Sequence, residues 1–236
     1  MDKKQLVVKY KTLVGLACRV YSLPSRLAVK SSGKNNRVEA PCALLKKTRI
    51  HFSGNNNRVI FQDFARLDRV ALEIHGDNNT VVIGPWSYVA HMEVCTEDGH
   101  NCVEIGERTR ILGSTHLAAL EGTTIRIGEE CLFSSNIHFR TGDSHSVLDM
   151  TGKRINPSRD ITVGDHVWVG TGVTCLKGAM IPGHSIVGAA SVVTGQFETP
   201  NCVLAGVPAK VVKTDVDWTL QRLPVEEAAT NGQQEE

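Results

Sequence analysis

Hydrophobic residues recur at every sixth position over the last third of the chain. Between Val163 and Val193 this period is unbroken, and a second series of small or aliphatic residues follows four positions behind it. An α-helix would repeat every 3.6 residues and a half-buried strand every second residue, so neither explains the pattern. A six-residue period is typical of a chain wound into triangular coils with one short strand per side. The two series are Val163, Val169, Cys175, Ile181, Val187 and Val193, and Val167, Val173, Ala179, Ser185 and Ser191.

A longer repeat precedes this run. Five similar units, most opening on Gly-Asn or Gly-X-Asn, end at residues 40, 61, 83, 105 and 127. A spacing of about 22 residues is one coil of three hexapeptides with about four extra residues at one corner. Glycine and asparagine tolerate left-handed backbone conformations, which places these stretches at the corners. We therefore predict one all-β domain over residues 33–213, a parallel β-helix of about eight coils.

The six-residue frame is broken once, at residues 140–160. This segment is polar and rich in turn-forming residues. A loop thrown out of a regular solenoid is a common place for functional residues. We therefore expect residues 140–160 to protrude from the β-helix and to carry the chemistry.

The two ends of the chain differ from the repeats. Residues 1–32 are basic and predict a short N-terminal helix that covers one end of the solenoid or, alternatively, lies on an anionic membrane surface. Residues 214–236 end in acidic and polar residues, and we expect this tail to be partly disordered. The expected apolar stripe of the helix is Leu6, Val7, Tyr10, Leu13, Val14, Leu16 and Ala17.

The composition excludes several classes of protein. Lys plus Arg is 26 and Asp plus Glu is 25, so the basic excess of a nucleic-acid binder is missing. The chain has no apolar run long enough for a transmembrane helix, and no signal peptide is recognised. Seven cysteines without a CxxC pair indicate a reducing, cytoplasmic setting, and association with the inner face of the membrane is left open.

Four features together resemble the hexapeptide-repeat acyltransferases. They are the six-residue run, the loop sequence Gly-Asp-Ser-His-Ser at 142–146, the Asp-His-Val-Trp-Val-Gly segment at 165–170, and Ala-Gly-Val-Pro-Ala-Lys at 205–210. The spacing between the loop histidine and the tryptophan is most similar to bacterial capsule and polysialic acid O-acetyltransferases. The resemblance implies a left-handed β-helix, which the repeat pattern alone does not decide.

The resemblance also implies roles for individual residues. His145 would be the general base that takes the proton from an acceptor hydroxyl, a task that suits histidine. Asp143 and Asp149 lie close enough in sequence to be candidates for orienting its ring. Trp168 would line the acceptor and thioester channel, and the Gly170 amide would stabilise the oxyanion. Acetyl-CoA would contact Trp168, Gly170, Gly188, Ala189, Ala190 and Lys210, and the acceptor would contact Arg140, Asp143 and Trp168.

The other histidines are weaker candidates. His138 precedes the core residue Phe139 and should point outward, and His166 and His184 are expected to face solvent. A catalytic zinc site would need three histidines. Only His116, His138 and His145 form a conceivable set. We expect no metal, because no histidines are recognised at matching positions of successive coils.

Together these features predict an acetyl-CoA-dependent O-acetyltransferase that acts on a carbohydrate hydroxyl, such as that of a bacterial surface or capsular polysaccharide. Two alternatives are an acetyltransferase for a small acceptor (a nucleotide-linked amino sugar, a free sugar or serine) and a non-catalytic β-helix scaffold. The resemblance implies a homotrimer, because members of the family build each active site between two subunits. Nucleic acid is not an expected partner.

Overall fold

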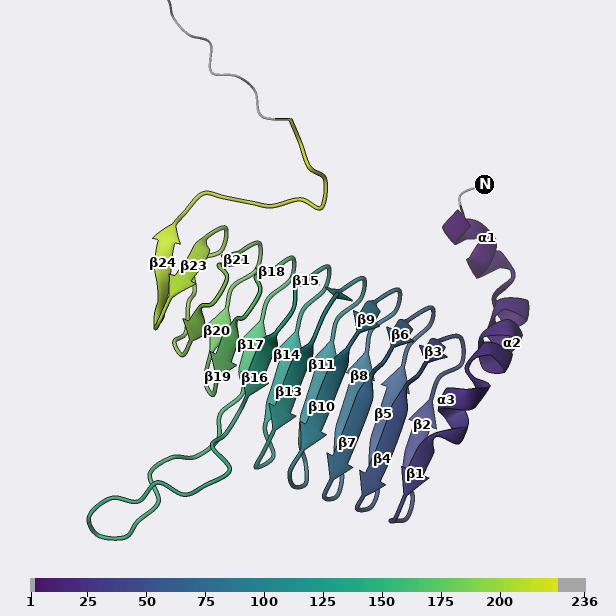
Figure 1. Ribbon diagram of the computed structural model, residues 1–236, viewed down its shortest axis with the longest axis horizontal. Coiled ribbons are helices and arrows are strands. Elements are labelled where there is room, and N and C mark those ends of the chain that lie inside the picture. The colour runs from purple at the N-terminus through teal and green to yellow at the C-terminus, as the bar shows by residue number, and fades with distance from the viewer. Residues whose placement is uncertain (1–2, 225–236) are drawn as a thin grey trace, which may run out of the picture.

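The chain winds into eight coils of a parallel β-helix, and every coil but the last contributes a strand to each of three sheets (Figure 1). The computed structural model describes residues 3–224. The fold is the predicted left-handed β-helix. Sheet A contains β1 (Val29–Ser31), β4 (Arg49–Ser53), β7 (Ala71–His75), β10 (Met92–Thr96), β13 (Thr115–Ala119), β16 (Ile137–Arg140), β19 (Thr174–Leu176) and β22 (Val192–Val193).

The other two sheets complete the triangle. Sheet B contains β2 (Arg37–Glu39), β5 (Arg58–Phe61), β8 (Thr80–Ile83), β11 (Cys102–Ile105), β14 (Thr124–Ile127), β17 (Ile161–Val163) and β20 (Met180–Ile181). Sheet C contains β3 (Leu44–Lys46), β6 (Arg66–Asp68), β9 (Tyr88–Ala90), β12 (Arg110–Ile111), β15 (Leu132–Phe133), β18 (Trp168–Val169), β21 (Ile186–Val187), β23 (Val203–Gly206) and β24 (Ala209–Lys213). The three corners are named here by the sheets they join: the AB, BC and CA edges.

The strand registers confirm both predicted repeats. Ile105 pairs with Ile127, 22 residues later, whereas Val163 pairs with Ile181, 18 residues later. Ile127 pairs with Val163, so the coil that carries the loop is 36 residues long. The six-residue series from Val163 to Val193 is buried at every member.

The interior is a single column of apolar side chains. The rings of Phe133 and Phe139 pack with centroids 5.6 Å apart. Cys131 and Cys175 lie fully inside, as predicted. Burial raises the pKa of the Cys131 thiol to about 12, so it remains a protonated, hydrophobe-like group.

The asparagine-rich stretches form the AB edge, as predicted. Asn57, Asn79 and Asn101 stack in successive coils, and each side-chain oxygen accepts the backbone N–H of the next member at 2.8–2.9 Å, with Asn101 passing the contact to Thr123 at 3.2 Å. Thr123 Oγ1 then donates to Thr141 Oγ1 at 2.6 Å, at the first residue of the protruding loop. The ladder therefore satisfies buried backbone donors along this edge and ends at the loop.

Three short helices cover the first coil: α1 (Lys3–Lys9), α2 (Lys11–Tyr21) and α3 (Leu23–Leu27). The face of α2 that packs inward carries Gly15 and Cys18, whereas Leu13 and Leu16 are 66% and 62% exposed. Most of the predicted stripe is therefore not on the packing face, although Val14 is half-buried, because a small-residue face lets α2 approach the coil closely. None of the helices within residues 3–224 is long and apolar enough to cross a membrane.

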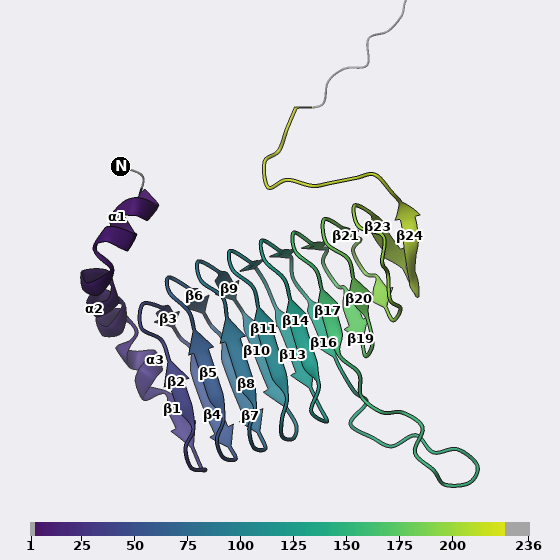
Figure 2. The same cartoon turned by 180° about the vertical axis from the view of Figure 1, so that it is seen from behind.

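The last coil is followed by a strand that turns back. β24 pairs antiparallel with β23, and the chain then runs back over the coils (Figures 1 and 2). Val216 N–H donates to Asn201 O at 3.0 Å, which fixes this return segment to the BC edge. The tail was predicted to be partly disordered; its residues 225–236 lie outside the described residues, and residues 214–224 lie along the solenoid.

Candidate active site

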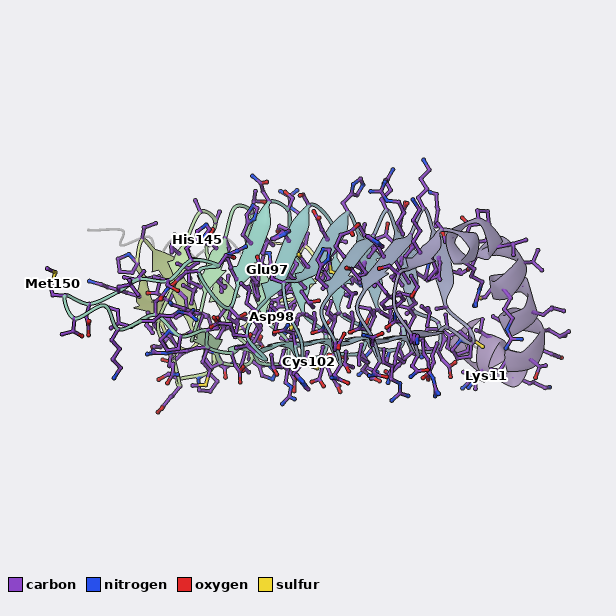
Figure 3. The ribbon with its side chains drawn as sticks, turned by 90° about the horizontal axis from the view of Figure 1, so that it is seen from below. Lys11, Glu97, Asp98, Cys102, His145 and Met150 are labelled. Carbon is purple, nitrogen blue, oxygen red and sulfur yellow. The ribbon has the colours of Figure 1, made fainter. Side chains whose placement is uncertain are left out.

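The loop predicted at residues 140–160 comprises residues 141–160 and leaves the solenoid at the AB edge between β16 and β17 (Figure 1). Its outer part folds back on itself, because the Asp149 carboxylate accepts the N–H groups of Thr151 and Lys153 at 2.8 and 3.0 Å. Met150 stands at the far tip, and His145 lies nearer the root (Figure 3). The position of His145 is therefore set by the root of the loop.

Glu97, which follows β10 two coils before the loop, holds the first part of the root. Its carboxylate accepts a hydrogen bond from Arg140 Nη2 at 2.8 Å and another from the Ser144 hydroxyl. Arg140 also donates to Ser144. Charge-assisted hydrogen bonds of this kind are stronger than neutral ones, so the residue next to His145 is tied to the solenoid.

A second set of contacts holds the other side of the root. The Asp143 carboxylate pairs with Lys177 and accepts a hydrogen bond from Asn156 Nδ2 at 2.7 Å. The same amide group donates to the His145 carbonyl at 2.7 Å, and Asn156 is buried. The bonds from Lys177 and then Asn156 lower the pKa of Asp143, which stabilises its charged form.

Glu121 forms the third anchor. It pairs with Arg154 and accepts the Ser158 N–H at 3.1 Å. The hydrogen bond from Arg154, followed by those from Ser158, lowers the pKa of Glu121 to about 2. The ascending and the returning segments of the loop are thus both fixed where they meet the solenoid.

Removing the first anchor should loosen the loop. In Glu97→Ala, loss of two charge-assisted hydrogen bonds, about 1.5–3 kcal/mol each, should raise the rate of proteolysis within residues 141–160 roughly tenfold or more. The melting temperature should change little, because the side chain lies outside the core. Glu93→Ala on the same sheet face is the matched control. Equal cleavage rates in the two variants would show that Glu97 does not hold the loop.

Acid should release the third anchor. Because the folded-state pKa of Glu121 is lowered, its stabilising contribution is complete above its ordinary value of about 4.5 and is lost as the pH falls towards about 2. Pepsin cleavage of the loop should therefore accelerate across this range. Glu121→Gln should already be loosened at pH 5 and should lose most of this dependence. An unchanged pH profile in Glu121→Gln would contradict the assignment.

The imidazole of His145 is exposed, and no hydrogen bond to it is found among residues 3–224. The two carboxylates considered for orienting it are engaged elsewhere: Asp143 with Lys177 and Asn156, and Asp149 within the loop tip. Within one copy of the chain the ring is therefore available to a ligand. His138 also points outward, as predicted, with its ring 6.1 Å from that of His116.

Trp168 faces outward from sheet C, as predicted, and is 38% exposed. Its ring lies 6.3 Å from that of Trp218 on the return segment.

Gly170 follows at the start of the CA edge, where a Cβ would lie 2.8 Å from the backbone nitrogen of Ala189. Glycine at this position therefore allows the two corners to stack closely.

The oxyanion role predicted for Gly170 does not fit the geometry. Its N–H donates to Val187 O at 2.8 Å as part of the ladder between coils, and the residue is buried. The next amide differs: Thr171 is exposed, and no acceptor for its N–H is found in the part of the chain that the structure describes. The free donor at this corner is therefore one residue later than predicted.

The other predicted cofactor residues lie along the CA edge or beyond it. Gly188 uses its N–H to bind Leu204 O, whereas Ala189 and Ala190 are exposed small residues directly above Thr171 and Gly172. Lys210 is exposed on β24, farther along sheet C. This row of small residues leaves room for an extended ligand to lie against the backbone.

The structure does not bring all predicted site residues together within one copy. His145, Arg140 and Asp143 belong to the AB edge, whereas Trp168 lies on sheet C and the small residues lie on the CA edge. Arg140 and Arg154 are neutralised by Glu97 and Glu121. In the described range, Lys153 and Arg159 are the loop cations for which no ion pair is found.

Sequence reasoning missed the anchors and the histidine pairs. Glu97 and Lys177 lie far from the loop in sequence. Only counting along the chain in coils of 22 and 18 residues could have shown that they come close to the loop in space. Histidines do recur at matching positions, contrary to expectation: His116 pairs in register with His138, and the tilted rings of His166 and His184 lie 5.1 Å apart. The three-histidine set with His145 does not come together.

Comparisons with known proteins agree with one another. No protein-family model matches the chain. The chain is 33% identical over 189 residues to polysialic acid O-acetyltransferase of Neisseria meningitidis, which covers 79% of this chain and 86% of the relative. The crystal structure of polysialic acid O-acetyltransferase OatWY superimposes with a TM-score of 0.80 at 29% identity, covering 83% and 92% of the two chains. The polySia-specific acetyltransferase NeuO gives 0.76 at 29% identity, covering 87% and 93%.

Proposed function

The chain belongs to the hexapeptide-repeat O-acetyltransferases, and from that premise we propose that it transfers an acetyl group from acetyl-CoA to a hydroxyl of a bacterial surface polysaccharide. The observation that carries the proposal is His145: an exposed imidazole with no partner among residues 3–224, on a loop fixed at three points. A general base needs an imidazole that is fixed in position and whose nitrogen is free to accept the proton of the substrate.

The reaction follows from three groups. His145 takes the proton of the acceptor hydroxyl while that oxygen attacks the thioester carbonyl of acetyl-CoA. The carbonyl oxygen becomes an oxyanion, for which the free Thr171 N–H is the donor at the CA edge. When the C–S bond breaks, the imidazolium returns its proton to the CoA thiolate, and the acetyl ester is released. Trp168 packs against the acceptor or the pantetheine arm beside this point.

Each site is shared between copies of the chain. The loop and the face that carries Trp168 and Thr171 lie on different edges, so the loop of one subunit must reach sheet C of its neighbour (Figures 1 and 2). A closed ring of three subunits, in which every loop meets the next sheet C, satisfies all sites equally. Acetyl-CoA then lies along the CA edge at the subunit boundary, beside Ala189, Ala190 and Lys210.

The acceptor is an anionic polymer such as polysialic acid. The outer part of the loop projects away from its own solenoid, with Met150 at the far end (Figure 3). Lys153 and Arg159 remain as loop cations that could meet acceptor carboxylates, since Arg140 and Arg154 are neutralised. The name of the Neisseria meningitidis relative supports the same acceptor class.

The reaction takes place in the cytoplasm. All seven cysteines are free thiols, as expected in a reducing compartment where acetyl-CoA is available. The exposed face of α2 carries Leu13, Leu16 and Val20 among basic residues and is the surface suited to the inner face of the membrane.

Release of free thiol from acetyl-CoA tests the function. The acceptors to compare are polysialic acid, a neutral polysaccharide, free sugars, a nucleotide-linked amino sugar and serine. We expect rapid release with polysialic acid and an alkali-labile ester on the polymer. Release with a small acceptor alone would place the chain among acetyltransferases of small molecules. No release with any acceptor would favour a non-catalytic scaffold.

A further inference from the structure

Three side chains with metal-binding atoms converge at the BC edge, away from the loop. His166 and His184 occupy the same corner of successive coils, with ring centroids 5.1 Å apart. Asp217, on the return segment, places one carboxylate oxygen 3.4 Å from His166 Nε2 and the other 3.7 Å from His184 Nδ1. One donor atom from each of the three lies within 4.8 Å of the others.

We propose that His166, His184 and Asp217 form a binding site for one divalent transition-metal ion of the zinc type. Donor atoms about 2.0–2.2 Å from a tetrahedral zinc ion lie roughly 3.3–3.6 Å from one another, which is close to the 3.4 and 3.7 Å between the Asp217 oxygens and the two imidazoles. Two imidazoles with one carboxylate favour zinc, nickel, cobalt or copper over magnesium and calcium, which prefer oxygen ligands.

The backbone carbonyl of Trp218 is a candidate fourth ligand. The carbonyl oxygen of Trp218 lies 3.0 Å from His166 Nε2 and accepts a hydrogen bond from its N–H when no ion is bound. An ion at the centre of the three side chains would take the place of that proton. The donor set would then be two nitrogens and two oxygens, with the carbonyl or a water in the fourth position.

The ligands are held in place before any ion arrives. His166 and His184 have positive φ angles of 54° and 55°, and their N–H groups bind Glu129 O and Asp165 O at 2.7 and 2.9 Å. Corner positions of this kind project their side chains outward from each coil in one row. The two imidazoles therefore need no backbone rearrangement to share an ion.

Trp218 builds the wall of the site. Its indole stacks on the His166 ring with centroids 4.4 Å apart and 11° between the planes, and its Nε1–H donates to His166 O at 2.8 Å. The His166 side chain is consequently only 24% exposed. The ion would be shielded on one side by the indole and would bind the return segment to the solenoid. The adjoining hollow of about 250 Å³ also contains the Arg108–Glu130 pair.

Other histidine pairs of the chain lack this convergence. His51 and His75 lie 6.3 Å apart, and His116 and His138 lie 6.1 Å apart. Glu73 binds His51 at 3.1 Å, but no third donor joins them within the described range. The BC-edge cluster is thus the group of this kind among residues 3–224 with three donors in reach of one ion.

Metal titration of the full-length, tag-free chain tests the site directly. Calorimetry with zinc chloride should give one ion per chain, and cobalt should give the visible absorption of a tetrahedral ion. Asp217→Asn and His184→Asn should each weaken binding at least about tenfold. Asparagine suits the positive φ at position 184, so this variant should fold normally. His100→Asn, at an exposed corner with φ of 66°, is the matched control and should bind like the wild type.

Three results would overturn the proposal: no binding at one ion per chain, equal binding in the double variant His184→Asn/Asp217→Asn, or equal weakening by His100→Asn. A second measurement does not depend on affinity. Zinc should slow proteolysis within residues 214–224 of the wild type but not of Asp217→Asn. Thermal unfolding of each metal-free variant checks that the fold is retained. None of these readouts requires acetyl transfer, so the site can fail or stand independently of the proposed function.

Discussion

Replacing His145 by alanine should lower acetyl transfer by about 10²- to 10⁴-fold, the usual contribution of a general base. The fold should not change, because no partner of the imidazole is found in the described range 3–224 and the loop root is held by other residues. Turnover of acetyl-CoA with polysialic acid is the measurement, and thermal unfolding checks the fold.

Two control substitutions distinguish the loss of the general base from a general disturbance of the loop. Ser146→Ala changes the next loop residue, and His138→Ala removes the other exposed histidine near the root of the loop. Both should keep most of the activity. If His138→Ala abolished transfer while His145→Ala did not, the base would be His138, and the loop would have another role.

Replacing Asn79 by alanine should cause the largest loss of stability for a substitution outside the apolar column. Asn79 is 1% exposed, and its Oδ1 accepts the backbone N–H of Asn101 at 2.9 Å. Leaving that buried amide unpaired costs about 1–3 kcal/mol, and each further hydrogen bond lost with the side chain costs about 0.5–1.5 kcal/mol. For a chain of this size each kcal/mol lowers the melting temperature by about 2–4 °C.

The neighbouring Asn78 provides the control. It is exposed at a φ of 60°, so Asn78→Gly keeps the backbone conformation and leaves the ladder intact. Thermal unfolding should show a clear drop for Asn79→Ala and a small change for Asn78→Gly. Equal shifts would mean that the asparagine ladder does not stabilise the AB edge beyond its turns.

The coils could be predicted from the sequence because each repeat carries its own evidence. The six-residue series ending at Val193 fixes which residues point inward, and the Gly-Asn stretches fix one corner. Once the corner is known, the excess residues between Phe139 and Val163 can only form a loop at the same edge. The fold therefore follows from local signals that repeat.

The predictions of individual contacts failed where a contact depends on how residues of one coil, or of the chain ends, align with the next coil. The Gly170 amide lies in the ladder and Thr171 does not, a difference of one residue that no motif reveals. The packing face of α2 follows from small residues, Gly15 and Cys18, although the hydrophobic stripe pointed elsewhere. Asp217 meets His166 only because the chain turns back after β24.

Mixing two variants with defects in opposite halves of the site tests most directly whether each active site is shared between copies. His145→Ala lacks the general base on the loop. Trp168→Ala lacks the indole that packs against the substrates on sheet C of the neighbouring subunit. If subunits of the two variants mix randomly in a ring, about a quarter of the boundaries join an intact loop to an intact sheet C. Co-refolded mixtures should regain about a quarter of the wild-type turnover. Activity no higher than the average of the separate variants, in mixtures shown to contain both chains, would contradict a shared site and place His145 and Trp168 in separate roles.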